Sequence, residues 1–328
     1  MLKGLALTPP VVGRISIGRV VERGAKRQPI RDDEFTLTTQ IQTRDGWMLH
    51  PLDEQLRKAQ AEAKIDFHAQ ATHPGIQDPA KAQAPVKLRR IPIRLLFDDP
   101  DLNLRASYCL FDRGTGRPVC VGNGDTCRRA TAQGVLTKEC PAPESCELAE
   151  QGCKPFGRLN VRIGDEEELS TFVFRTTGFN SIRTLATRLK YFQAVSGGNL
   201  STLPLELRLR GKSTQQSHGT PIYYVDLTVR TGSTLKEAIF EAKNEALAKQ
   251  EAGFSQADLD CAAREGLALG AFEESQEDGA VFVDEFFSSP EQEPGRGDGQ
   301  AHSPDASPSE SLRNKLERKA AARVRTPS

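Results

Sequence analysis

Aromatic residues are scarce in this chain of 328 residues: they make up 6% of it, with one Trp and four Tyr. So few rings argue against a surface that binds single-stranded nucleic acid by stacking its bases. No apolar run reaches the ~18 residues that a membrane-spanning helix needs. The apolar start of the chain is short and is broken by Pro9 and Pro10, unlike a signal peptide. We therefore expect a cytoplasmic protein that has no membrane partner. We do not expect a secreted protein stabilised by disulfides.

The net charge is zero, because 44 basic residues balance 44 acidic ones, but the two signs are unevenly distributed. Residues 273–310 contain 11 acidic residues and one basic residue, whereas residues 311–328 contain six basic residues and one acidic residue. Residues 80–215 contain 21 basic and 14 acidic residues. The chain therefore combines a mildly basic body with an acidic and then basic tail, and this excess alone does not establish nucleic-acid binding.

Hydrophobic periodicity switches between strand-like and helix-like along the chain and predicts an α+β fold. Hydrophobic residues make up only 37% of the chain, which fits an ordered core diluted by a disordered part. We expect a mixed, β-rich body with an inserted cysteine-rich zinc module, a C-terminal helical hairpin and a disordered tail. The predicted boundaries are 1–111 for the N-terminal part of the body, 112–157 for the zinc module, 158–232 for the α/β remainder of the body, 233–272 for the hairpin and 273–328 for the tail.

Strand patterns recur through the predicted body. Residues 86–97 alternate between apolar and polar positions, as a half-buried strand does. Pro92 interrupts this alternation and has no N–H group, so it predicts an edge strand or a bulge. Residues 159–163 and 205–209 alternate in the same way and are predicted strands.

Two helix signals are clear. Residues 179–192 place apolar side chains at helical spacing, and Asn180 or Ser181 is the expected cap. Thr234 and Glu237 match the capping-box pattern and predict the start of the first hairpin helix.

Five cysteines occur within 34 residues, in a stretch rich in Gly and Pro: Cys120, Cys127, Cys140, Cys146 and Cys153. A reducing cytoplasm disfavours disulfides there, and so irregular a stretch needs another source of stability. Four thiolates around one Zn²⁺ form a closed tetrahedral site that can contribute ~10 kcal/mol or more to folding. We predict structural zinc, with scattered free thiols and an iron–sulfur cluster as the alternatives.

The choice of four ligands rests on the surrounding residues, because no pair of cysteines has the tight spacing of common zinc fingers. Cys140, Cys146 and Cys153 are predicted ligands in a stretch punctuated by Pro and Gly. Cys120 is the preferred fourth ligand, because the Gly-rich bend that follows it would let the backbone turn around a metal. Cys127 is the alternative fourth ligand.

Enzyme motifs are missing from the sequence. It contains no P-loop, no nucleophile elbow and no complete dinucleotide-binding pattern, and its five histidines lack zinc-hydrolase spacing. A metal-dependent hydrolase would have to rely on scattered groups such as His68 and Asp99. We therefore predict no catalytic and no cofactor-binding residues, and a hydrolase is the third of three hypotheses.

Arginines surround the cysteines and line one face of the helix predicted at 179–192. Guanidinium groups bind phosphates and release counterions, so these residues are candidate contacts to nucleic acid or to a partner protein. The alternative is that they cover solvated faces and pair with acidic residues. The candidates are Arg128, Arg129, Arg158, Arg183 and Arg188.

The order of these features resembles the recombination directionality factor-like proteins of phages and integrative elements. The resemblance covers about residues 10–230 and leaves out the hairpin and the tail. Similar chains of conjugative elements and plasmids are labelled metal-binding proteins or hydrolases. The segments that carry the resemblance are Gly13-Arg-Ile-Ser-Ile-Gly18, Arg-Pro-Val-Cys120-Val-Gly, Arg128-Arg129, Cys140-Pro, Cys146 and Cys153-Lys-Pro-Phe-Gly-Arg-Leu159.

The resemblance implies a zinc-stabilised α/β body in a bacterial cytoplasm, with Cys120, Cys140, Cys146 and Cys153 as ligands and Cys127 as an extra cysteine. For phage members it implies a non-enzymatic protein that binds a serine integrase or recombinase and biases recombination towards excision. The second hypothesis is a zinc-stabilised nucleic-acid-binding accessory protein in replication or repair of a plasmid or integrative element. The expected partner is a protein of the mobile element, with DNA as a second.

Overall fold

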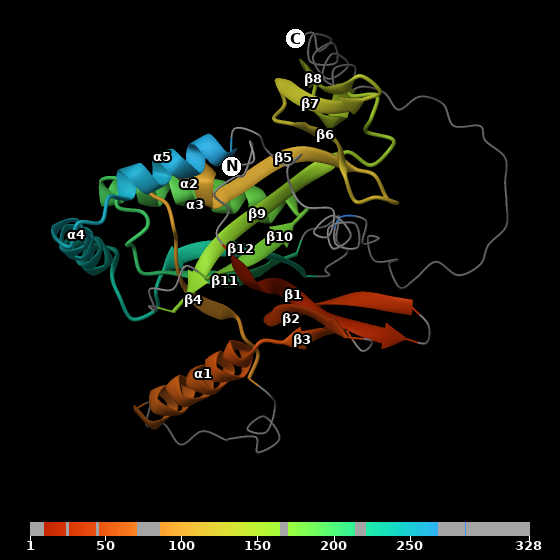
Figure 1. Cartoon of the computed structure of the whole chain (residues 1–328). Helices are drawn as coiled ribbons and strands as arrows, with labels where there is room; N and C mark the ends of the chain where they lie inside the picture. Colours follow the sequence, from red (N-terminus) through yellow and green to blue (C-terminus); the bar gives the residue numbers. More distant parts are fainter. Residues whose placement is uncertain are drawn as a thin grey trace, which may run out of the picture. The chain divides into compact units, whose positions relative to one another are not determined.

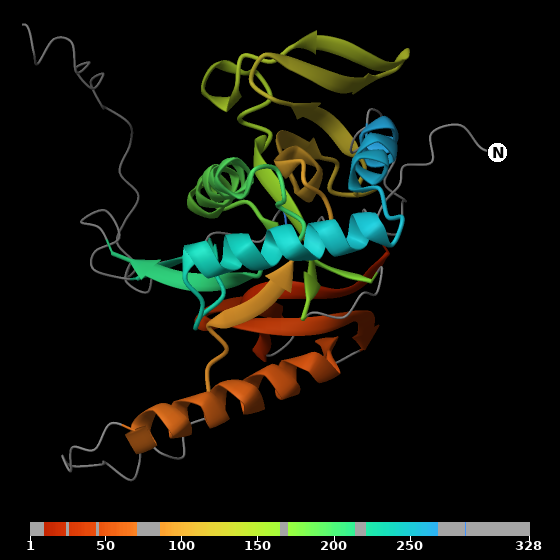
Figure 2. The ribbon, with the colours of Figure 1, turned by 90° about the vertical axis from the view of Figure 1, so that its left-hand side faces the viewer.

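The computed structural model describes residues 10–23, 26–43, 46–70, 86–164, 170–213, 221–267 and 286 (Figures 1 and 2). For residues 19–23, 26–32, 63–70 and 266–267 it describes the backbone alone. The described residues all belong to the unit Met1–Ser288; the second unit, Ser289–Ser328, lies outside them. The predicted tail is therefore outside the described residues, with the exception of Phe286.

Twelve strands of the described residues form the sheet. In chain order they are β1 (Val11–Arg23), β2 (Lys26–Thr43), β3 (Gly46–Leu49), β4 (Arg90–Arg94), β5 (Leu104–Phe111), β6 (Pro118–Gly122), β7 (Thr126–Thr131), β8 (Gly134–Glu139), β9 (Lys154–Ile163), β10 (Thr171–Thr176), β11 (Leu205–Lys212) and β12 (Ile222–Val229). They pair in the order β3-β2-β1-β10-β9-β5-β6-β7-β8, and β4, β11 and β12 branch from β9. The β1–β10 pair is parallel, while β9 is antiparallel to each of its neighbours.

Strand β9 connects the cysteine-bearing strands to the rest of the sheet. Its residues 154–159 pair with β5 and its residues 157–161 pair with β10. Its last residues, Arg162 and Ile163, pair with β4, which continues into β11 and β12. A displacement at the start of β9 would therefore reach strands on both branches of the sheet.

Five α-helices and a short 3₁₀ helix complete the described elements: α1 (Pro51–Gln70), α2 (Pro100–Asn103), η1 (Pro143–Ser145), α3 (Phe179–Ser196), α4 (Leu235–Glu251) and α5 (Gln256–Leu267). The mixture of a large sheet and separate helices confirms the α+β prediction. The two helices expected as a hairpin are both present. They run in different directions in Figure 2, with α4 packed on α3 and α5 packed on α2.

The main hydrophobic core lies between the sheet and helices α3 and α4. Helix α3 contributes Leu185, Leu189 and Phe192, and α4 contributes Ala238 and Ala242, all of them buried. The strands facing them supply branched and aromatic side chains, which include Ile91, Ile93, Leu159, Val161, Phe172, Phe174, Leu205, Leu207, Val225 and Leu227. The helical spacing seen in the sequence therefore marks the buried stripe of α3.

The prediction for Pro92 is wrong. Strand β4 pairs with β11 on one side and with β9 on the other, and its register with β11 has no bulge. The pairing with β9 is confined to Ile93 and Arg94, so the N–H group that Pro92 lacks is not needed on that side.

The helix ends agree with the sequence at α4 and differ at α3. Thr234 and Glu237 form the expected capping box, in which each side chain accepts a bond from the other residue's backbone N–H. Gly178, rather than Asn180 or Ser181, occupies the N-cap of α3, and no side chain caps it. Ser181 Oγ instead accepts the Val225 N–H at 3.1 Å, which ties α3 to β12.

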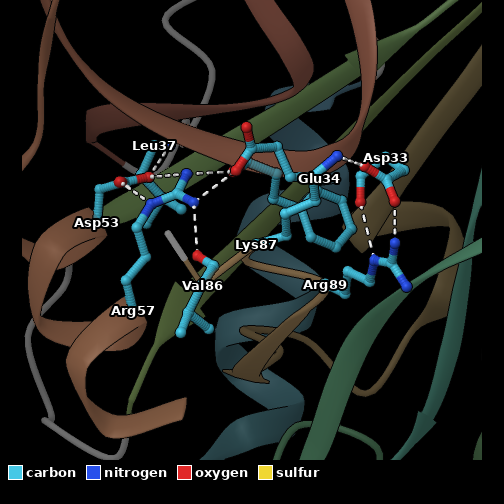
Figure 3. A network of polar contacts seen from close by, with 9 residues as sticks. Asp33, Glu34, Leu37, Asp53, Arg57, Val86, Lys87 and Arg89 are labelled. Atoms are coloured by element: carbon cyan, nitrogen blue, oxygen red, sulfur yellow. Dashed lines mark hydrogen bonds and ion pairs between the residues drawn. The ribbon is translucent and has the colours of Figure 1, made fainter. Parts of the chain in front are cut away.

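Helix α1 is attached to β2 by a polar network (Figure 3). Buried Asp53 accepts the Leu37 N–H at 2.9 Å and pairs with Arg57 Nε at 2.6 Å. Arg57 also pairs with Glu34 at 2.5 Å, and donates to the Phe35 carbonyl at 2.9 Å and the Val86 carbonyl at 3.1 Å. One guanidinium therefore holds α1, β2 and the chain entering β4 together.

Candidate functional site

Five cysteines come together at the end of the sheet formed by β6, β7 and β8. They pack with Leu110 and Leu148 in one cluster, which we call the cysteine cluster: Cys120, Cys127, Cys140, Cys146 and Cys153. Cys120 lies in β6 and Cys127 in β7, while Cys140 follows β8. Cys146 ends η1, and Cys153 directly precedes β9. Residues spread over 34 positions of the sequence thus converge on one place.

Gly122 packs tightly against Cys140 and Cys127. A Cβ at this position would lie 2.7 Å from Cys140 Sγ and 2.7 Å from Cys127 Cβ. Gly122 pairs with Cys127 across β6 and β7, and the Cys140 N–H donates to the Asp125 carbonyl at 2.8 Å. A residue without a Cβ at position 122 therefore lets β6 pack closely against Cys127 and Cys140.

The thiols of the cluster act on one another electrostatically. Burial, followed by the negative charge that the neighbouring thiolates would carry, raises the pKa of Cys153 to about 11; these neighbours are Cys120, Cys146, Cys140 and Cys127. Burial also raises the pKa of Cys127, and its thiol lies within hydrogen-bonding reach of Cys120. Several thiolates can share so small a space only with a compensating cation.

Arg129 lies beside the cysteine cluster. It lies opposite Cys120 across the β6–β7 pair, its side chain is 15% exposed, and its Nη1 pairs with Glu147 at 2.6 Å. The Glu147 carboxylate and a hydrogen bond to Cys120 raise the pKa of Arg129. A residue considered as a surface contact therefore also orients the Cys120 sulfur.

The donor set fits a structural zinc site better than a catalytic one. All five groups are thiols, three of them buried, and an all-thiolate shell leaves no position for substrate. In the described residues, no three His, Cys, Asp or Glu side chains are arranged as a formed metal site. The structure brings the four predicted ligands and Cys127 together alike, so it does not choose between Cys120 and Cys127 as the fourth ligand.

The candidate arginines fall into two groups. Arg128 and Arg129 lie on β7 and Arg158 lies on β9; of these, Arg129 is opposite Cys120, while Arg128 is opposite Val121 and the Arg158 guanidinium is 5.7 Å from the Phe156 ring. Arg183 and Arg188 lie on α3 and line an open pocket of about 420 Å³, which we call the basic pocket. Its other lining residues are Asn180, Thr184, Thr187, Tyr191, Lys212 and Tyr224.

Arg188 of the basic pocket is held by Asp226, a residue that the sequence did not single out. Asp226 is 2% exposed, and it pairs with Arg188 at 3.1 Å and with Arg210 at 2.6 Å. Lys212 donates to Asn180 Oδ1 at 2.8 Å. The single acid within a strand pattern was the only signal of this arrangement. The pocket combines cations with two tyrosines, which suits a phosphate or an acidic side chain.

Asp99 does not offer free oxygens for a hydrolytic metal. Its Oδ1 accepts the Asp101 N–H at 2.9 Å as the cap of α2, and its Oδ2 pairs with Arg264 at 2.7 Å. The side chain of His68 lies outside the described residues. Both Asp99 oxygens are thus engaged in packing α2 and α5.

Residues 12–230 match the Gp3-like family, described as recombination directionality factor-like, so the chain belongs to this family. The matched region begins in β1 and ends just after β12, and so includes the whole described sheet and the cysteine cluster. Such membership indicates an accessory protein of recombination in a phage or mobile element. Neither a curated protein nor a solved structure matches the chain.

None of the described helices is both long enough and apolar enough to cross a bilayer.

Proposed function

We propose that this chain is a non-enzymatic accessory protein that binds a site-specific integrase and biases recombination towards excision. The observation that carries the proposal is the family match over residues 12–230, which spans the sheet from β1 to β12. The expected partner is a serine integrase or recombinase of the same mobile element. No catalytic residue is required, because the protein would act by binding alone.

The bias would come from preferential binding to one state of the integrase–DNA complex. A ligand shifts an equilibrium only by its difference in affinity for the two states. A difference of ~2–3 kcal/mol would change the ratio of the two states by roughly 30- to 150-fold. This range is ordinary for a protein interface and needs no covalent chemistry.

We propose that Zn²⁺ is held in the cysteine cluster by Cys120, Cys140, Cys146 and Cys153, with Cys127 as the alternative to Cys120. The bound ion would neutralise neighbouring thiolates and fix β6, β7 and β8 relative to β9. The role of the metal would be structural. The convergence of these cysteines in one cluster supports the proposal.

The basic pocket is the candidate contact surface. Arg183, Arg188 and Lys212 would bind carboxylates of the integrase or phosphates of its DNA. The same surface supports the second function, a nucleic-acid-binding accessory protein in replication or repair of a mobile element. Arg128 of β7 and Arg158 of β9 are further candidate contacts to nucleic acid or to a partner protein.

Retention of purified integrase on the immobilised full chain tests the first function. We expect stoichiometric binding, weakened at least tenfold by Arg183→Ala combined with Arg188→Ala. Lys236→Ala, which removes an exposed cation of α4 outside the matched region, is the control and should bind as the wild type does. Absence of integrase binding by the folded wild-type protein would contradict the proposal.

A DNA titration at several salt concentrations tests the second function. If Arg128 contacts a phosphate, Arg128→Ala should lower the slope of log affinity against log salt by about 1. An unchanged slope in the folded variant would remove Arg128 from a DNA interface.

A further inference from the structure

An aromatic pocket lies on the opposite face of the strands that carry the cysteine cluster. On β5, Leu110 packs with the cysteines, whereas its neighbours Cys109 and Phe111 pack together with Phe156 of β9. On β6, Cys120 faces the cysteines and Val121 packs on the other side. The alternation of side chains along each strand thus separates two sites, a sulfur site and an aromatic one.

Phe286 fills this pocket. It belongs to the part of the chain that follows the family match, residues 231–328, which we call the C-terminal extension. Its side chain is 0% exposed. Its ring meets Phe111 at 4.9 Å and 79° and Phe156 at 5.8 Å and 79°, both edge to face. Phe111 and Phe156 are themselves 5.6 Å apart at 81°. Three mutually perpendicular rings form the arrangement that aromatic quadrupoles favour.

A cation closes the pocket over the bound ring. Lys154 Nζ lies 4.5 Å from the centre of the Phe286 ring, within the range of a cation–π contact. Lys154 follows Cys153, and β9 pairs it with Cys109 of β5. The residues preceding Phe286 in the sequence are Asp284 and Glu285, which match the positive charge of Lys154 and Arg158. Shape, apolar surface and charge thus all favour an acidic segment with a phenylalanine anchor.

We propose that this pocket is a peptide-binding site for a phenylalanine-anchored acidic segment, and that the chain's own C-terminal extension occupies it through Phe286. The family-matched body supplies the pocket, and the extension supplies its ligand. Occupancy places Phe286 against β5 and β9, which also border the cysteine cluster. The proposal is independent of integrase binding.

Alkylation of Cys109 in the full chain tests occupancy. Cys109 is 2% exposed and lies in the pocket beside Phe286. In Phe286→Ala we expect Cys109 to react with iodoacetamide at least about tenfold faster than in the wild type, as followed by peptide mass spectrometry. Phe286→Leu should retain most of the protection, and Phe240→Ala, which removes a 68% exposed ring of α4, should leave the rate unchanged.

A peptide of residues 278–290 added to Phe286→Ala separates a binding site from ordinary core packing. We expect the peptide to restore protection of Cys109, and the same peptide carrying Phe286→Ala to have no effect. An unchanged Cys109 rate in Phe286→Ala would overturn the proposal. So would protection that the peptide fails to restore, which would make Phe286 a core residue, or protection that depends on protein concentration, which would place the extension of a second copy in the pocket.

Discussion

A single missing side chain allows the cysteine cluster to form. Any Cβ at position 122 would come within 2.7 Å of Cys140 Sγ, too close for a real contact. We predict that Gly122→Ala lowers the free energy of unfolding by about 1–3 kcal/mol, because overpacking displaces β6 from the sulfurs. Gly114→Ala is the matched control: the nearest atom there, Asp112 Oδ1, is 3.5 Å away, so denaturant unfolding should give a change near zero. Equal losses in the two variants would argue against a close fit at Gly122.

Individual cysteines differ in the role that we assign to them. We predict that Ser in place of Cys140, Cys146, Cys153 or Cys120 abolishes stoichiometric zinc binding, because each removes one of four thiolates. Cys127→Ser should retain zinc. Native mass spectrometry of proteins purified without added metal measures the content directly. If Cys127→Ser lost the metal and Cys120→Ser kept it, Cys127 would be the fourth ligand, and a metal-free, folded wild type would contradict the zinc proposal altogether.

The sequence indicated which cysteines lie together, but it did not indicate contacts that depend on distant partners. The convergence of the cysteines followed from residue type and from flanking Gly and Pro. Arg129 illustrates what could not be predicted, since its contacts to Cys120 and Glu147 arise from the β6–β7 pairing. Asp226 gathers arginines from α3 and β11, and no spacing in the sequence reveals that.

At the scale of elements, α5 is attached to the body through Asp260. This side chain is 7% exposed and accepts the N–H groups of Asp98 and Asp99 at 3.0 Å each. Burial raises the pKa of Asp260 above its ordinary value of 3.8, and the hydrogen bond from Gln256 opposes that rise. The charged carboxylate is thus less favoured in the folded chain than in the unfolded one.

The pH dependence of stability follows from that raised pKa. The contribution of Asp260 to the free energy of unfolding is fully present below pH 3.8, and it is lost as the pH rises through the raised pKa that Asp260 has in the folded protein. Asp260→Asn keeps an acceptor without the charge. We predict that the unfolding free energy of the wild type, relative to Asp260→Asn, falls as the pH is raised from about 3.8 towards neutrality. Denaturant melts of both proteins across this range measure the difference, and a gap that widened in favour of the wild type would contradict the assignment.

Helix α1 depends on a different single residue. Arg57 neutralises Asp53 and Glu34 and satisfies the carbonyls of Phe35 and Val86. We predict that Arg57→Ala destabilises the protein by about 3 kcal/mol, because it leaves largely buried carboxylates without their partner. Lys58→Ala breaks the exposed i,i+4 pair with Glu54 and should leave the stability close to that of the wild type, and thermal melts of both variants measure the difference. If Arg57→Ala lost as little stability as Lys58→Ala is expected to lose, the network around Arg57 would contribute little.

The elements themselves were predictable to the extent that they depend on local pattern. The apolar stripe of α3 and the capping box of α4 lie where the sequence indicates. The cap of α3 differs from the prediction, because Ser181 Oγ accepts the Val225 N–H of β12 and does not cap the helix. Pro92 misled for the same reason: whether a strand is an edge depends on which distant strand pairs with it.

At the scale of the whole molecule, the strand order is the part that local patterns could not supply. β1 pairs in parallel with β10, and β4 is flanked by β9 and β11, which are all remote in sequence. Phe286 is more remote still, yet it packs between Phe111 and Phe156. The matched region nevertheless coincides with the sheet, so family membership and the architecture describe the same body.

The most direct test of the central proposal is a recombination assay with the integrase of the same element. One substrate carries the two junction sites of the integrated element, and the other carries the two sites before integration. We predict that adding this chain raises excision relative to integration by roughly 30- to 150-fold, as a difference of ~2–3 kcal/mol in binding would require. An active integrase whose two reaction rates keep the same ratio at saturating amounts of this chain would contradict the account.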